Sequence, residues 1–115
     1  RDYLPNVAMT LNNLGNLHRV TGKHEKAEEE LGEALETYRA LASSTPEAYL
    51  PNVAMTLYNI AIFRIKHDNL DDAEKLAQES LEKYEIMAKL SPAAFAPYVE
   101  KAKFLLELIQ KMSNS

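Results

Sequence analysis

A nine-residue string, YLPNVAMTL, occurs twice in this chain, at residues 3–11 and again at 49–57. The two copies begin 46 residues apart, and the segments that they open agree at 19 positions when aligned without a gap. Another 46 residues on, Pro97 falls in register with Pro51. Repeats of roughly 20 to 50 residues are typical of solenoids, in which each unit buries its apolar face on its neighbour. The repeat therefore constrains the fold more than any other feature of the sequence.

Each full unit reads as two helices. In the first helix, Val7, Leu11, Leu14 and His18 recur at steps of four and three, which is helical spacing. A break follows at residues 21–24, with Gly22 as the expected left-handed residue. In the second unit, we expect Asp68 or Asn69 to take that role. The second helix is expected over 25–42, with this inner stripe: Ala27, Leu31, Ala34, Leu35, Tyr38 and Leu41.

Proline marks the start of the next unit. Residues 43–51 and 90–97 are expected to link the units, with Thr45–Pro46 and Ser91–Pro92 each starting a short extra turn. We therefore predict an all-α fold: a right-handed α-solenoid of antiparallel helix pairs, with two and a half repeats and five helices. The single domain spans 1–115, with repeats at 3–48 and 49–94 and a half repeat or capping helix at 95–113.

Composition limits the functions that the chain can have. The net charge is −4, which disfavours phosphate-backbone binding, because such binding needs clustered Lys and Arg. No apolar run approaches the roughly 18 residues of a membrane span. Cysteine is absent, which removes disulfides and thiolate metal sites and is compatible with a reducing compartment. We therefore expect a cytoplasmic protein that binds neither nucleic acid nor membrane.

No catalytic constellation stands out. The chain has three glycines and no phosphate-cradling pattern, so we expect neither an enzyme nor a cofactor. His24 and Glu28 lie four residues apart on a helix, but without a third ligand they read as a solvated pair rather than a metal site. We expect His18 to be a core histidine with a hydrogen-bond partner. We expect the glutamate run 28–30 to form a solvated helix face.

The repeat resembles the tetratricopeptide repeat family, in the long-unit variety found in kinesin light chain and in bacterial and archaeal proteins. The matching positions are Leu11, Leu14, Gly15, Ala27, Leu31 and Ala34 in unit one, and Leu57, Ile60, Ala61, Ala73 and Ser80 in unit two. The resemblance implies that Gly15 and Ala27, like Ala61 and Ala73, let the two helices of one hairpin approach closely. Glu107 stands where Gly15 and Ala61 stand in their units, which implies that the fifth helix is a terminal cap or that its register slips.

The resemblance also implies a function, the binding of a partner peptide or protein segment on the concave face of the first helices. Asn13 and Asn59 would hold the backbone of an extended peptide, and Arg19 and Lys66 would attract an acidic group. Carried over by position, the expected peptide-binding residues are Asn12, Asn13, Asn16, Arg19, Tyr58, Asn59, Ile62 and Lys66.

Two alternatives stay open. The asparagines would equally well hydrogen-bond between neighbouring helices without any ligand. In the fifth helix, Phe104, Leu105, Leu108 and Met112 form an apolar strip beside the core stripe of Val99, Ala102, Leu106 and Ile109. That strip would line the groove or bind another copy of the chain, so a homo-oligomer through the C-terminal helix is an alternative. The chain would then be a structural spacer or self-association unit within a larger repeat protein.

Overall fold

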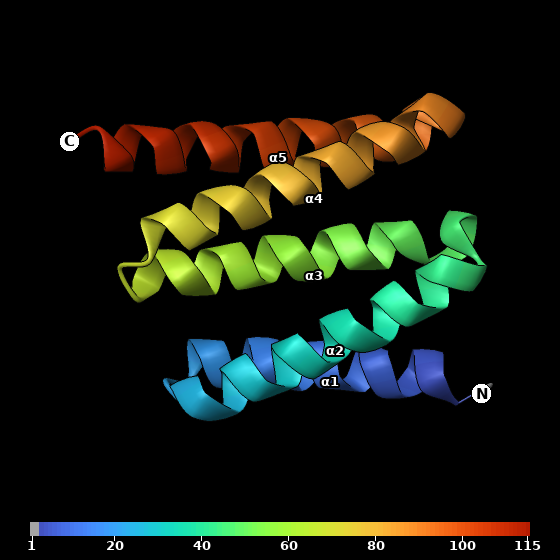
Figure 1. Ribbon diagram of the computed structural model, residues 1–115, viewed down its shortest axis with the longest axis horizontal. Coiled ribbons are helices and arrows are strands. Elements are labelled where there is room, and N and C mark those ends of the chain that lie inside the picture. The colour runs from blue at the N-terminus through green and yellow to red at the C-terminus, as the bar shows by residue number, and fades with distance from the viewer. Residues whose placement is uncertain (1–2) are drawn as a thin grey trace.

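The computed structural model describes residues 3–115, and over that range it contains five α-helices and no β-strand. They are α1 (Leu4–Val20), α2 (His24–Ser44), α3 (Pro46–Lys66), α4 (Leu70–Leu90) and α5 (Pro92–Ser113). α1, α3 and α5 run in one direction, and α2 and α4 return between them (Figure 1). The most extensive contacts join helices that are consecutive in the chain. The predicted all-α helical solenoid of five antiparallel helices is confirmed.

The turns inside the two hairpins each contain one left-handed residue. Gly22 has φ 83°, as the sequence predicts, and Asp68 takes the equivalent role in the second hairpin with φ 59°. Asn69 then caps α4, because its side-chain oxygen accepts a hydrogen bond from the backbone N–H of Asp72 at 3.3 Å. Both hairpins therefore reverse within a few residues, and their helices are held antiparallel.

The connections between hairpins are shorter than the sequence predicts. The short extra turns expected at Pro46 and Pro92 are wrong, since α3 and α5 begin at these prolines and continue without a break. Proline fits the first helical position because the N–H that it lacks would have no partner there. Pro51 lies one turn further in and removes a single backbone hydrogen bond. A loss so close to the helix end does not separate the first turn from the rest.

Small residues set the distance between the helices of a hairpin. A Cβ atom at Gly15 would lie 2.6 Å from Cγ of Leu31 and 2.7 Å from its Cδ2, so only glycine fits without displacing the leucine. Ala27 in the first hairpin and the pair Ala61 and Ala73 in the second are fully buried. The close approach is therefore made by residues that contribute little or no side-chain volume.

The outer side of α1 differs from the prediction. Val7 and Leu14 belong to the residues that recur at helical spacing, but they are 41% and 39% exposed. Their counterparts 46 residues on, Val53 and Ile60, are buried, at 1% and 7%. The physical reason is that α2, from the first hairpin, packs on this side of α3, the first helix of the second hairpin. None of the described helices covers the corresponding side of α1.

α5 packs with one face on α4. The predicted stripe Val99, Ala102, Leu106 and Ile109 is buried, and so is Leu105. Glu107 is exposed to solvent, and burying its charge under a partner helix would be costly. Within residues 3–115, no helix therefore covers the side of α5 that carries Glu107.

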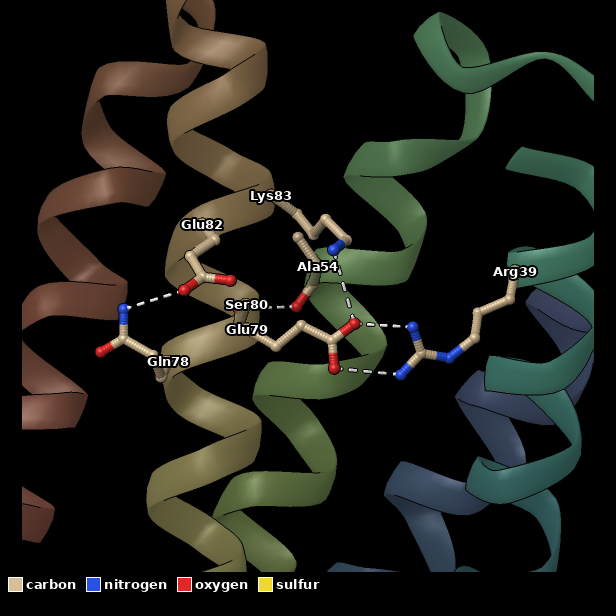
Figure 2. Close-up of polar contacts among 7 residues, drawn as sticks. All are labelled: Arg39, Ala54, Gln78, Glu79, Ser80, Glu82 and Lys83. Carbon is tan, nitrogen blue, oxygen red and sulfur yellow. Dashed lines mark hydrogen bonds and ion pairs between the residues drawn. The ribbon is translucent and has the colours of Figure 1, made fainter. Parts of the chain in front are cut away.

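Polar contacts also tie the helices together (Figure 2). The Ser80 hydroxyl of α4 donates a hydrogen bond to the buried carbonyl oxygen of Ala54 in α3 at 2.7 Å. Arg39 of α2 reaches across to α4, where its two terminal nitrogens donate to the Glu79 carboxylate at 2.6 and 3.1 Å. The hydrogen bonds from Arg39 hold the pKa of Glu79 below its usual range. The two hairpins are thus joined through α2 and α4 as well as through the apolar contact of α2 with α3.

The α4–α5 contact predicts a loss of stability at alkaline pH. Burial, with smaller contributions from Tyr98 and Tyr58, raises the pKa of Tyr84 to about 12. In the unfolded chain Tyr84 ionises near pH 10. Between about pH 10 and 12 the unfolded state therefore loses a proton that the folded state keeps, and stability falls as pH rises. Thermal unfolding at pH 9 and pH 11.5 measures this decrease, which is expected to be smaller in Tyr84→Phe.

Candidate functional site

The residues predicted to bind a peptide lie on α1 and α3. Asn13 and Lys66 are exposed, Asn12 is buried, and the other five are half-buried. We call this surface the first-helix face; its residues are Asn12, Asn13, Asn16 and Arg19 on α1 and Tyr58, Asn59, Ile62 and Lys66 on α3.

An amide pair joins the two helices on this face. The Asn59 side-chain nitrogen donates to the Asn12 side-chain oxygen at 3.4 Å. Asn12 is only 3% exposed, so it lies beneath the surface. Its position favours the alternative in which an asparagine bonds between neighbouring helices. The contact uses only the nitrogen of the Asn59 amide, so its oxygen can accept a further hydrogen bond.

α5 extends the same face. The ammonium nitrogen of Lys101 lies 5.2 Å from the centre of the Tyr58 ring, so this lysine stands over a side chain of α3. Burial raises the pKa of Tyr58. Three exposed apolar residues of α5 follow at the positions 46 residues after Tyr58, Ile62 and Lys66, and they are Phe104, Leu108 and Met112. The first-helix face therefore continues from an amide-rich part on α1 to an apolar part on α5.

Acidic residues are concentrated on the second helix of each hairpin, α2 and α4, rather than on the first, α1 and α3. Of the 17 acidic residues, six lie on α2 and six on α4. α1 has none, and α3 has only Glu47, in its first turn. Arg19 and Lys66 lie at the ends of α1 and α3, where Nε of Arg19 donates to the Asn16 side-chain oxygen at 3.5 Å. The first-helix face is therefore poor in acidic groups although the chain as a whole is acidic.

Each of the three histidines contacts other groups of the chain rather than standing free in solvent. Nδ1 of His18 lies 2.6 Å from a carboxylate oxygen of Glu30, in agreement with a core histidine that has a partner. Glu30 is thereby half-buried, which corrects the expectation that the whole run 28–30 is a solvated face. His24 packs edge-on against His67, with ring centres 4.4 Å apart. Within residues 3–115, no group of three or more potential metal ligands converges.

The larger hollows in the surface lie away from the first-helix face. One of about 610 Å³ lies between α4 and α5, beside Ile86 and Val99. Another, of about 560 Å³, follows the outer side of α4 and is lined largely by charged side chains, from Asp71 to Glu82. A third, of about 320 Å³, lies on the exposed side of α1. All three are open to solvent, and none brings together side chains suited to acid–base or nucleophilic chemistry. The arrangement supports contact with a partner rather than enclosure of a small substrate.

A family model described as "Tetratricopeptide repeat" matches residues 6–86, which is more than half of the chain. The chain belongs to the tetratricopeptide repeat family. Comparisons with curated proteins and with solved structures give no match. Tetratricopeptide repeats generally mediate protein–protein interactions, and the family is typically non-catalytic. Among the described residues of this tetratricopeptide repeat chain, no helix has the length and hydrophobicity needed to cross a bilayer.

One exposed surface of this tetratricopeptide repeat chain was not predicted from the sequence. The exposed side of α1 includes Tyr3, Val7 and Leu14, whose counterparts 46 residues on are buried or half-buried. Periodicity shows that residues share a helix face, but it does not show whether another helix covers that face. The duplicated string was the feature of the sequence that could have indicated this difference. The copy at 49–57 directly follows a predicted helix, and the copy at 3–11 does not.

Proposed function

We propose that the chain is a protein-interaction module that binds an extended, acidic peptide segment along the first-helix face. The division of charge carries this proposal. An acidic peptide would be repelled by α2 and α4, which hold twelve acidic residues, and would be attracted to the face that holds Arg19, Lys66 and Lys101.

Each part of the face has a role in this proposal. Asn13 and Asn59 bind the peptide backbone, since a side-chain amide offers both a donor and an acceptor. Asn12 holds Asn59 in position through the contact at 3.4 Å. Asn16 holds Arg19 in the same way. Tyr58, Ile62 and the exposed strip of α5 provide apolar contacts for peptide side chains.

The asparagines give the sharpest test. Asn13→Ala combined with Asn59→Ala is expected to weaken binding of any peptide selected from a random library by about 1–3 kcal/mol, because hydrogen bonds to the peptide backbone are lost. Isothermal titration of the selected peptide against both proteins measures the change.

Asn6→Ala is the matched control, because Asn6 is an exposed asparagine on another side of α1. It is expected to leave the affinity unchanged. Equal affinity of the double variant and the unaltered chain would refute the peptide-binding role of Asn13 and Asn59. Selection of basic rather than acidic peptides would refute the electrostatic part of the proposal.

Self-association is the second candidate function, and exposed apolar residues of α5 favour it. Phe104 is 69% exposed, and Leu108 and Met112 lie on the same side of the helix. Under this proposal the chain is a structural spacer that pairs through α5. Light scattering over a wide concentration range decides between the candidates, because a strict monomer excludes pairing and a dimer abolished by Phe104→Glu supports it.

The 46-residue period supports a finer placement in the long-unit, kinesin-light-chain-like variety of the family. It also supports units at 3–48 and 49–94 with a half unit at 95–113. A cytoplasmic location stays a prediction.

A further inference from the structure

Two exposed histidines from different hairpins lie against each other. His24 is the first residue of α2, and His67 directly follows the last residue of α3. Their ring centres are 4.4 Å apart, and the ring planes are nearly perpendicular, at 82°. In the sequence, His24 has only Glu28 as a companion ligand. The fold brings a second imidazole to it from 43 residues further along the chain.

Contacts within the chain fix the His67 ring and its tautomer. Nδ1 of His67 lies 2.8 Å from the backbone carbonyl oxygen of Phe63, and because a carbonyl oxygen only accepts, this nitrogen carries the proton of the neutral ring. The Phe63 ring also stacks on the His67 ring, with centres 4.2 Å apart. The lone pair of neutral His67 is therefore on Nε2. A hydrogen bond from the other ring nitrogen to a backbone carbonyl is typical of histidines that bind metal ions.

The His24 ring can be reoriented without moving its centre. His24 is exposed, and its ring contacts are with Phe63 and His67. Rotation about the Cβ–Cγ bond of a histidine has a broad range of allowed angles. The ring centre lies close to the axis of that bond, so the rotation changes where the nitrogens point and leaves the distance between the two rings almost unchanged.

The separation of the two rings suits neighbouring ligands of one metal ion. An ion bound to a nitrogen of each ring would lie about 3.2 Å from each ring centre, because the metal–nitrogen bond is about 2.1 Å long. Ring centres 4.4 Å apart then subtend an angle of about 90° at the ion. This is the angle between adjacent ligands in the tetragonal sites of copper(II) and nickel(II), and it is smaller than the tetrahedral angle that zinc prefers.

The surroundings of the two rings leave room for an ion and its water ligands. A hollow of about 310 Å³ lies beside His24. The other residues that line it are Lys23, Glu25 and Lys26, all exposed, and salt screens their charges. Arg64 lies over the Phe63 ring, but Asp72 at 2.7 Å and Glu28 at 3.3 Å offset its charge. The nearest guanidinium therefore presents little repulsion to a bound cation.

We propose that His24 and His67 form a two-ligand site for copper(II) or nickel(II), with water in the remaining positions. The ion joins α2 of the first hairpin to the turn of the second, so its binding stabilises the folded chain. Two protein ligands give a modest affinity, since half the binding free energy of a four-ligand structural zinc site corresponds to a Kd of about 1 to 200 μM. The proposal does not depend on peptide binding at the first-helix face.

Isothermal titration of nickel chloride into the full chain, without an added histidine tag, tests the site. One ion per chain is expected to bind with a Kd in this range, and saturating nickel is expected to raise the melting temperature by about 4 °C or more. His24→Gln and His67→Gln are each expected to weaken binding at least tenfold. Both residues are exposed, so these variants are expected to fold. His18→Gln is the control, because His18 is the third histidine of the chain and contacts Glu30 instead; it is expected to leave the affinity unchanged.

Copper(II) gives a second measurement on the same variants. Its electron paramagnetic resonance spectrum is expected to show coupling to two imidazole nitrogens in the unaltered chain and to one in His24→Gln. A Kd for nickel above about 1 mM, or equal affinity in the unaltered chain and both variants, overturns the proposal. Light scattering with saturating nickel is expected to show a monomer. A dimer that forms only with the metal also overturns the proposal, because the two histidines on one ion then belong to different chains.

Discussion

Ala27→Trp is expected to lower the free energy of unfolding by about 3 kcal/mol, the upper end of the cost of overpacking a core. Ala27 is completely buried between α1 and α2. The nearby contact between Gly15 and Leu31 leaves no room even for a Cβ atom, so the helices must move apart to admit an indole ring. Folded domains are stable by only about 5–15 kcal/mol, so the variant is expected to melt at a much lower temperature. Thermal unfolding followed by circular dichroism measures the change.

Ala40→Trp is the matched control for this prediction. Ala40 lies on the same helix, but it is exposed. The same change there is expected to alter stability by no more than about 0.5 kcal/mol. If the two tryptophan variants melt at the same temperature, the idea that small residues set the distance between helices is wrong.

Val53→Arg is expected to destabilise the chain by about 3–5 kcal/mol, the usual cost of leaving a buried charge without a partner. Val53 is 1% exposed beneath α2. The hollow beside it is lined by Arg39 and Lys83, so a new guanidinium would also meet two like charges. Denaturant unfolding is expected to show a lower midpoint with a similar slope.

Val7→Arg provides a control within the same nine letters. The residues from Tyr3 to Leu11 are identical to those from Tyr49 to Leu57, so local helix propensity is the same at the two valines. Val7 is 41% exposed, and its substitution is expected to change stability by no more than about 0.5 kcal/mol. A large loss of stability in Val7→Arg would show that this side of α1 is covered within the chain, contrary to the structure.

The sequence was sufficient to predict the fold because the fold is repetitive. The 46-residue period and helical spacing predicted five helices. Gly22 was predicted as a turn residue, and so was one of Asp68 and Asn69, because few residues adopt a positive φ; the structure shows that it is Asp68. The extra turns at Pro46 and Pro92 were wrong because proline suits both the end of a linker and the first residue of a helix. The helix that continues beyond each proline, packed on its neighbours, decides between these two uses.

The candidate site was less predictable from the sequence. Register placed Asn12, Asn13 and Asn59 on the helices, but only tertiary structure shows Asn12 buried beneath Asn59. Likewise, Lys101 lies 88 residues along the chain from Asn13, and its position over Tyr58 depends on how α5 packs.

The sequence alone determined most of the local structure: the number of helices, the reversals inside the two hairpins, and which residues share a face. These properties follow from backbone sterics and side-chain periodicity within a few residues. Tertiary structure alone decided which faces are covered, as the two copies of YLPNVAMTL demonstrate. Burial depends on neighbours from distant parts of the chain, so identical letters form a core under α2 and an open surface on α1.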